Sequence, residues 1–162
     1  MGKVACIAVA ALLVTVTFVY ATPRPGAAVA FAKHNHGGAA NKTRVLADRG
    51  DARAQTLLGF LHEHGRGVPQ DYMAAAYWYS CAAKQGDPTA QYLLGLMYDK
   101  GHGVPRSHLL AYKWLNLAAA RARPAVREYY QRIRDAVAAK LTPEQVAQAQ
   151  WLAYHFIPIR QR

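Results

Sequence analysis

Cysteine is scarce in this chain, which has 2 cysteines among 162 residues. Cys6 lies in an apolar N-terminal segment that we expect to be removed, which leaves Cys81 alone. A single cysteine excludes a disulfide within the chain. An exported domain of this kind must therefore be held together by its packed core.

Side chains arranged as catalytic nucleophiles or metal ligands are also few. Ser80 and Ser107 are the only serines, and neither lies in the strand–turn–helix elbow of a hydrolase nucleophile. His62 and His64 are two residues apart, whereas a helical zinc site places its histidines four apart. We therefore predict no catalytic residue, no metal and no cofactor. The alternative, a zinc or copper site, would add His34, His36 and His102.

Acidic residues are outnumbered by basic ones, 9 against 20, and the net charge of +11 favours encounters with anionic surfaces. Residues 1–30 combine Lys3, an apolar run and a small-x-small site, as a signal peptide does. We expect cleavage there and a periplasmic or secreted protein, which makes nucleic acid an improbable partner. The alternative is an uncleaved N-terminal segment that anchors the protein to the inner membrane, facing the periplasm. Residues 31–41 are predicted to be a flexible leader.

Residues 50–85 and 86–121 are two copies of one unit with a period of 36 residues, and 15 of the 36 aligned positions are identical. A fixed period of 20 to 50 residues is typical of a stacked array of helical units. Such arrays usually present surfaces that hold partners.

Each unit has the pattern of two helices. Asp51 and Asp87 are predicted to cap the first helix, which ends at a glycine-rich segment, Gly65–Pro69 or Gly101–Pro105. The second helix is expected over about 72–85 and 107–121. There Trp78 and Trp114 each share a face with alanine, which favours interlocking of neighbouring helices. Gly59 and Gly95, inside the first helices, indicate that a neighbouring helix crosses closely at these points.

Both ends of the array are predicted to be capped. Residues 42–50 resemble the end of a repeat and indicate a short capping helix. A helix is expected over 124–140, and Thr142 with Gln145 forms the capping box of a last helix. Residues 122–157 would then cover the apolar end of the stack.

The spacing of glycine, tryptophan and alanine closely resembles the Sel-1-like repeat, an αα-hairpin repeat related to the tetratricopeptide group. The pattern covers Ala54 to Asp87 and again Ala90 to Ala119, except that Ser107 replaces the loop aspartate and Arg121-Ala122 replaces the closing Gly-Asp. The resemblance covers about 42–157. It implies an all-α fold, a right-handed αα-hairpin solenoid of two Sel-1-like repeats with capping helices, that acts as a scaffold for protein interaction and has no shared catalytic site.

Two surfaces are candidates for binding. The first lies on the first helix of each unit, where a groove could receive a partner peptide; its residues are Arg53, Thr56, Phe60, Thr89, Tyr92 and Leu96. The alternative is that Phe60, Tyr92 and Leu96 pack against the neighbouring repeat. The second is the arginine-rich C-terminal helix with Arg123, Arg127, Arg132 and Arg134. It could hold an anionic surface, or could simply be a solvated helix face.

The sequence therefore predicts a non-enzymatic scaffold, adaptor or regulator in the bacterial cell envelope, with an unidentified envelope or secreted protein as its partner. The alternative is a basic binder of anionic lipid or polysaccharide that uses the arginine-rich helix. Ionic strength separates the two hypotheses, because contacts between exposed charges weaken steeply with salt.

Overall fold

A computed structural model describes residue 38 and residues 40–159. The signal-peptide prediction, His34, His36 and most of the predicted leader lie outside the described residues. Every regular element in the described part is a helix. Residues 40–48 form the first helix, followed by α2 (Ala52–His64), α3 (Tyr72–Lys84), α4 (Pro88–Lys100), α5 (His108–Arg121), α6 (Pro124–Ala138) and α7 (Pro143–Tyr154). None of the described helices is long and apolar enough to cross a membrane.

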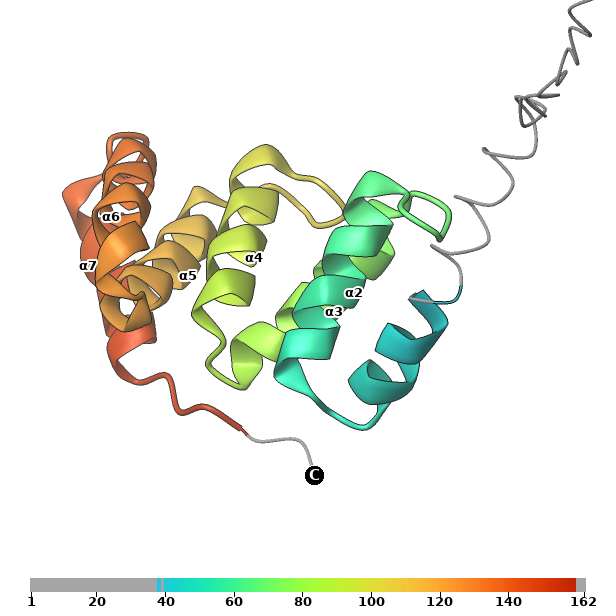
Figure 1. Ribbon diagram of the computed structural model, residues 1–162. Coiled ribbons are helices and arrows are strands. Elements are labelled where there is room, and N and C mark those ends of the chain that lie inside the picture. The colour runs from blue at the N-terminus through green and yellow to red at the C-terminus, as the bar shows by residue number, and fades with distance from the viewer. Residues whose placement is uncertain (1–37, 39, 160–162) are drawn as a thin grey trace, which may run out of the picture.

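The helices of each repeat pair into hairpins that follow one another in a row, α2 with α3 and α4 with α5, and both α6 and α7 pack against α5 (Figure 1). This arrangement confirms the predicted all-α hairpin solenoid. The bounds differ slightly from those expected. Residues 40 and 41 belong to the first helix rather than to the leader, because Ala40 is buried against the folded domain. The helix predicted over 124–140 ends at Ala138.

The predicted caps are present at the expected positions. The Asp51 and Asp87 carboxylates each accept a hydrogen bond from a first-turn amide, that of Ala54 or Ala90, at 2.7 Å. Helices α2 and α4 both end at a glycine with a left-handed backbone, which lets the chain leave the helix. Thr142 forms the capping box that opens α7.

Tryptophan and alanine form the spine of the array, as predicted. Trp114 is 6% exposed and belongs to the main core cluster with Ala82, Ala83 and Ala90 of the neighbouring helices. Trp78 is half-buried and packs against the smaller cluster that contains Ala47. Each tryptophan therefore lies where its own unit joins the preceding one.

The close helix crossing predicted at Gly59 is confirmed. A Cβ atom on Gly59 would lie 2.6 Å from the Tyr79 ring of α3, and one on Gly95 would lie 2.8 Å from Leu115 of α5. Tyr79 is fully buried, and its hydroxyl donates to Glu63 Oε2 at 2.7 Å. Burial, followed by this hydrogen bond, raises the pKa of Tyr79 well above its usual value.

Buried glutamines join each unit to the one before it. Gln55 Nε2 donates to the Ala47 carbonyl, and Gln91 Nε2 donates to the Ala83 carbonyl, both at 3.1 Å. The two glutamines are 36 residues apart, so the same contact is repeated at both junctions. A buried amide with a specific partner fixes the register between the units.

Candidate functional site

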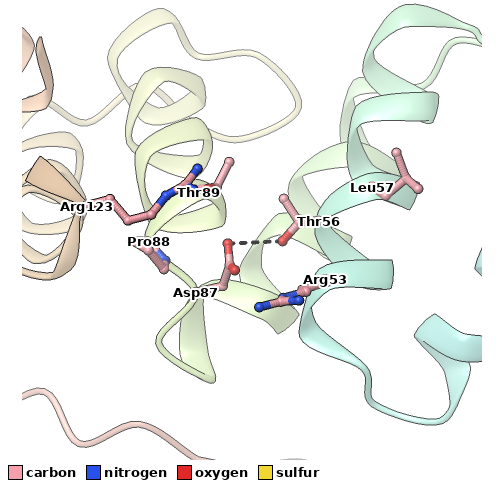
Figure 2. Close-up of a pocket in the computed structure, with 7 residues that line it drawn as sticks. All are labelled: Arg53, Thr56, Leu57, Asp87, Pro88, Thr89 and Arg123. Atoms are coloured by element: carbon pink, nitrogen blue, oxygen red, sulfur yellow. Dashed lines mark hydrogen bonds between the residues drawn. The ribbon is translucent and has the colours of Figure 1, made fainter. Parts of the chain in front are cut away.

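A groove opens between the two repeats, with a volume of about 580 Å³ (Figure 2). We call it the inter-repeat groove. Helix α2 supplies one wall, the start of α4 supplies the floor, and the residue before α6 closes the far side. Its lining residues are Arg53, Thr56, Leu57, Asp87, Pro88, Thr89 and Arg123.

Asp87 holds the floor of the groove in place. Its Oδ1 atom caps α4 through the Ala90 amide and lies 3.2 Å from the Thr56 hydroxyl of α2. The same hydroxyl lies 2.9 Å from the Ala52 carbonyl, so its single proton is shared between the two acceptors. Asp87 therefore links the two repeats as well as starting a helix.

Two arginines enter the groove from opposite sides, with Asp87 between them (Figure 2). Both Arg53 and Arg123 are exposed, and within the described residues neither side chain makes a hydrogen bond or an ion pair. The groove thus presents two unpaired guanidinium groups around one carboxylate that is already bonded. Guanidinium groups match carboxylates in geometry as well as in charge.

Arg123 occupies a position where both repeats have a capping aspartate, since Asp51, Asp87 and Arg123 are successively 36 residues apart. It is the N-cap residue of α6 and makes no side-chain capping bond. A cation at a helix N-terminus also opposes the helix dipole. Arg123 therefore does not stabilise the start of α6, and its side chain is free to line the groove.

The groove brings together only part of the predicted partner-binding surface. Arg53, Thr56 and Thr89 line it, together with Arg123 from the predicted anionic-surface group. Leu57, Asp87 and Pro88 were not predicted as site residues. They belong to the groove because it forms across two units, and the repeat pattern describes only what lies within one unit.

The remaining predicted partner-binding residues lie away from the groove. Phe60 is half-buried, and its ring is tilted by 32° against that of His64 with the centroids 4.1 Å apart. The Arg66 guanidinium lies 5.3 Å from the centre of the Phe60 ring. Leu96 is half-buried. Phe60 also packs against the main core cluster, in agreement with the alternative that it has a packing role.

Tyr92 connects the second repeat to the C-terminal cap. Its ring stacks on Tyr130 of α6 with centroids 4.3 Å apart, and its hydroxyl lies 3.1 Å from that of Tyr129. Burial is the main cause that raises the pKa of Tyr92, and burial likewise raises that of Tyr130. Tyr92 therefore packs against a neighbouring element, which is the alternative stated for it above.

The predicted arginine surface of α6 is divided in the structure. Arg123 lines the inter-repeat groove, while Arg127 donates to the Ala122 carbonyl at 3.1 Å. Arg134 pairs with Asp135 at 2.8 Å and bonds to Asn116. Arg132 is exposed and lines neither this groove nor the shallow hollow that Arg127 and Arg134 share. Two of the four arginines are thus already engaged within the chain.

The histidines do not gather. In the described ranges, 38 and 40–159, no group of three or more histidine, cysteine or acidic side chains could hold a metal ion. His64 Nδ1 lies 3.0 Å from the Phe60 carbonyl, and His108 pairs with Asp99 at 2.9 Å.

Comparison with known proteins places this architecture. The Sel1 repeat model matches residues 52–87 and 88–122. The crystal structure of a Sel1 repeat protein from Oxalobacter formigenes is 40% identical, covers 55% of this chain and 67% of that chain, and superposes with a TM-score of 0.51. The chain belongs to the Sel1 repeat family. Proteins built from Sel1 repeats are generally scaffolds for protein–protein interaction and are typically non-catalytic.

A second solved structure is similar over more of the chain. It is c5321, a protective antigen present in uropathogenic Escherichia coli strains that displays an SLR fold. It is 31% identical, covers 83% of this chain and has a TM-score of 0.72, while this chain spans 29% of the c5321 chain. No curated protein sequence matches this Sel1 repeat protein.

Proposed function

We propose that this Sel1 repeat protein is a non-enzymatic scaffold of the bacterial cell envelope, and that it holds a partner protein in the inter-repeat groove. The observation that carries the proposal is Arg123. It replaces the aspartate that caps the equivalent helix in both repeats, makes no capping bond, and lines the groove instead. Residues that break a local rule without a structural gain are expected at functional sites.

The chemistry of the groove favours an extended acidic segment of the partner. Arg53 and Arg123 provide two cationic positions in the groove. Leu57 of α2, which is 48% exposed, provides an apolar contact on the same lining. The volume of about 580 Å³ far exceeds the roughly 30 Å³ that one water molecule occupies in the liquid, so the groove has room for several groups. An extended chain can place a carboxylate at each arginine and an apolar side chain on Leu57.

Photo-cross-linking tests the proposal directly. A photoreactive amino acid placed at Leu57 should link the protein to a defined partner when cells are illuminated. The Arg53→Glu/Arg123→Glu variant should lose that product, because it reverses both cationic positions. The matched control is Arg106→Glu/Arg132→Glu, which changes the net charge equally at two exposed arginines outside the groove.

Equal loss of the cross-link in both double variants would show that only overall charge matters, and the groove would be excluded as the specific site. Salt provides a further criterion. Because the inter-repeat groove presents two exposed arginines, partner affinity should fall as ionic strength rises, so salt does not separate a groove contact from the anionic-surface alternative as the sequence suggested. Affinity that is independent of salt would contradict a contact made by these two side chains.

The envelope location rests on the N-terminal sequence. Its apolar run and small-x-small site support export, with cleavage near residue 30. Intact-mass analysis of the protein purified from the periplasmic fraction should give a chain that begins close to residue 31. Recovery of the full 162-residue chain in the membrane fraction would indicate the anchored alternative instead.

A further inference from the structure

The last residues of the described chain display an apolar surface. After α7 ends, residues 155–159 run back beneath the array toward the turn between α3 and α4 (Figure 1). Four large apolar side chains of α7 and this tail are exposed to solvent. We refer to these four side chains together as the C-terminal patch: Trp151 at 60%, Tyr154 at 87%, Ile157 at 79% and Ile159 at 67%.

The tail is firmly attached, so the patch is a fixed surface. Phe156 meets the Trp114 ring edge-on, with centroids 5.4 Å apart, and the Arg121 guanidinium lies 5.5 Å from its ring centre. Pro158 lies against Gly86, and the Ile159 amide donates to the Lys84 carbonyl at 2.9 Å. Phe156 and Pro158 thus face the protein, and the alternate residues Ile157 and Ile159 face outward.

Charge identifies the kind of surface that fits the patch. Glu144, in the first turn of α7, is the last acidic residue of the sequence, and Arg160 and Arg162 directly follow the patch. Lys84 and Arg121, which contact the tail, are both exposed cations. The apolar and aromatic side chains of the patch are therefore flanked by basic residues in the sequence and by exposed cations on the elements that the tail contacts.

We propose that the C-terminal patch docks on the surface of an anionic lipid bilayer. Tryptophan and tyrosine side chains favour the headgroup region, where one end of the ring is apolar and the other is wet. The isoleucines would enter the upper acyl region, and the surrounding cations would meet anionic headgroups. A second copy of the chain fits less well, because a stable protein interface needs roughly 20–30 residues on each side.

Vesicle binding tests this inference with the full chain. The probes are vesicles of equal parts phosphatidylcholine and phosphatidylglycerol, and vesicles of phosphatidylcholine alone. The patch variant carries Trp151→Ser, Tyr154→Ser, Ile157→Ser and Ile159→Ser. Binding to the anionic vesicles should weaken on the order of a hundredfold in this variant, because four partly inserted apolar side chains are lost. Wild-type binding should be much weaker to phosphatidylcholine alone.

Matched variants separate the patch from other effects. Met73→Ser/Tyr77→Ser removes two apolar side chains that are 72% and 61% exposed on α3, and it should leave vesicle binding unchanged. All the substituted residues are exposed, so the helical circular dichroism signal and the melting temperature should be preserved. An equal loss in the α3 variant would contradict docking through the C-terminal patch.

Fluorescence gives a local readout that the apolar N-terminal segment cannot supply, because residues 1–30 contain no tryptophan. Bromine-labelled lipid in the anionic vesicles should quench the emission of Trp151, and Trp151→Phe should remove that quenched component. Quenching that persists unchanged in Trp151→Phe would overturn the inference. So would concentration-dependent dimerisation in sedimentation velocity that the patch variant abolishes, since it would assign the patch to a second copy.

Discussion

The two repeats share their framework but close their junctions differently. At the first junction, Gln85 Nε2 lies 2.9 Å from the Gly50 carbonyl and 2.8 Å from Gln55 Oε1. The residue 36 positions later is Arg121, whose guanidinium lies over Phe156 of the tail. Within the described residues, the buried Gln91 Oε1 consequently has no hydrogen-bond donor. The first repeat thus closes on its own start through Gln85, whereas the second repeat directs the equivalent side chain, Arg121, to the tail.

This difference shows how a repeat adapts to its place in a short array. In the part of the chain that the structure describes, one helix precedes the first repeat, and Trp78 of that repeat remains half-buried. The second has packed neighbours on both sides, and its Trp114 is almost fully buried. A helical array depends on the contacts between units as well as on each unit. The same tryptophan should therefore contribute unequally to the stability of the two junctions.

The largest expected effect follows from that inequality. Trp114→Ala should lower the free energy of unfolding by about 3–5 kcal/mol, the usual range for a large buried aromatic side chain. Trp78→Ala should cost roughly half as much, because part of its ring already contacts water. Urea denaturation of both variants checks the ratio. Equal losses would contradict the difference in burial.

The glutamine contact offers the next test. Gln85→Ala removes the amide that donates to the Gly50 carbonyl and to Gln55 Oε1. The substitution should lower the free energy of unfolding by about 1–3 kcal/mol. Arg121→Gln introduces the equivalent donor at the second junction. It should change stability by less than about 1 kcal/mol, because a gained hydrogen bond is offset by the lost cation–π contact.

A double-mutant cycle resolves those two opposing terms. In a Phe156→Leu background there is no ring for Arg121 to contact, so Arg121→Gln should stabilise the protein by about 1 kcal/mol. Chemical denaturation of the four chains gives the coupling energy. If Arg121→Gln is equally neutral in both backgrounds, Gln91 gains no partner from it.

Alkaline pH should distinguish the cores of the two repeats. Because Tyr79 has a raised pKa in the folded chain, its contribution to stability is fully present below pH 10 and is lost as pH rises further. The slope from one such group is at most about 1.4 kcal/mol per pH unit. Tyr79→Leu, which copies Leu115 of the second repeat, should reduce the slope. The free energy of unfolding of wild type and of Tyr79→Leu is measured from pH 8 upward. Equal slopes against pH in the two proteins would show that Tyr79 plays no part.

The sequence predicted well whatever recurs at a fixed spacing. Residues that have the same role in both repeats were predicted correctly: the caps at Asp51 and Asp87, the close crossings at Gly59 and Gly95, and the tryptophan spine. Contacts that have no copy were missed. Examples are Tyr79, whose counterpart is Leu115, the stack of Tyr92 on Tyr130, and the return of the tail to Lys84.

The candidate site was predicted only in part for the same reason. Arg53, Thr56 and Thr89 could be placed off the apolar face of a first helix by helical periodicity. The contribution of Arg123 depends on how α6 lies against the second repeat, which no period describes. Its alignment with Asp51 and Asp87 was nevertheless visible in the sequence, and the change from aspartate to arginine was the available signal.

A single substitution in the inter-repeat groove gives the sharpest test of the whole account. Arg123→Asp restores the capping residue of the repeats and should stabilise the protein by about 1 kcal/mol. The same substitution should remove the Leu57 cross-link to the partner, because it converts one cationic end of the groove to an anionic one. Thermal melting and cross-linking of this single variant are measured together. A higher melting temperature with no cross-link is the predicted result, whereas a stabilised protein that still captures its partner at full yield would contradict the role of the groove.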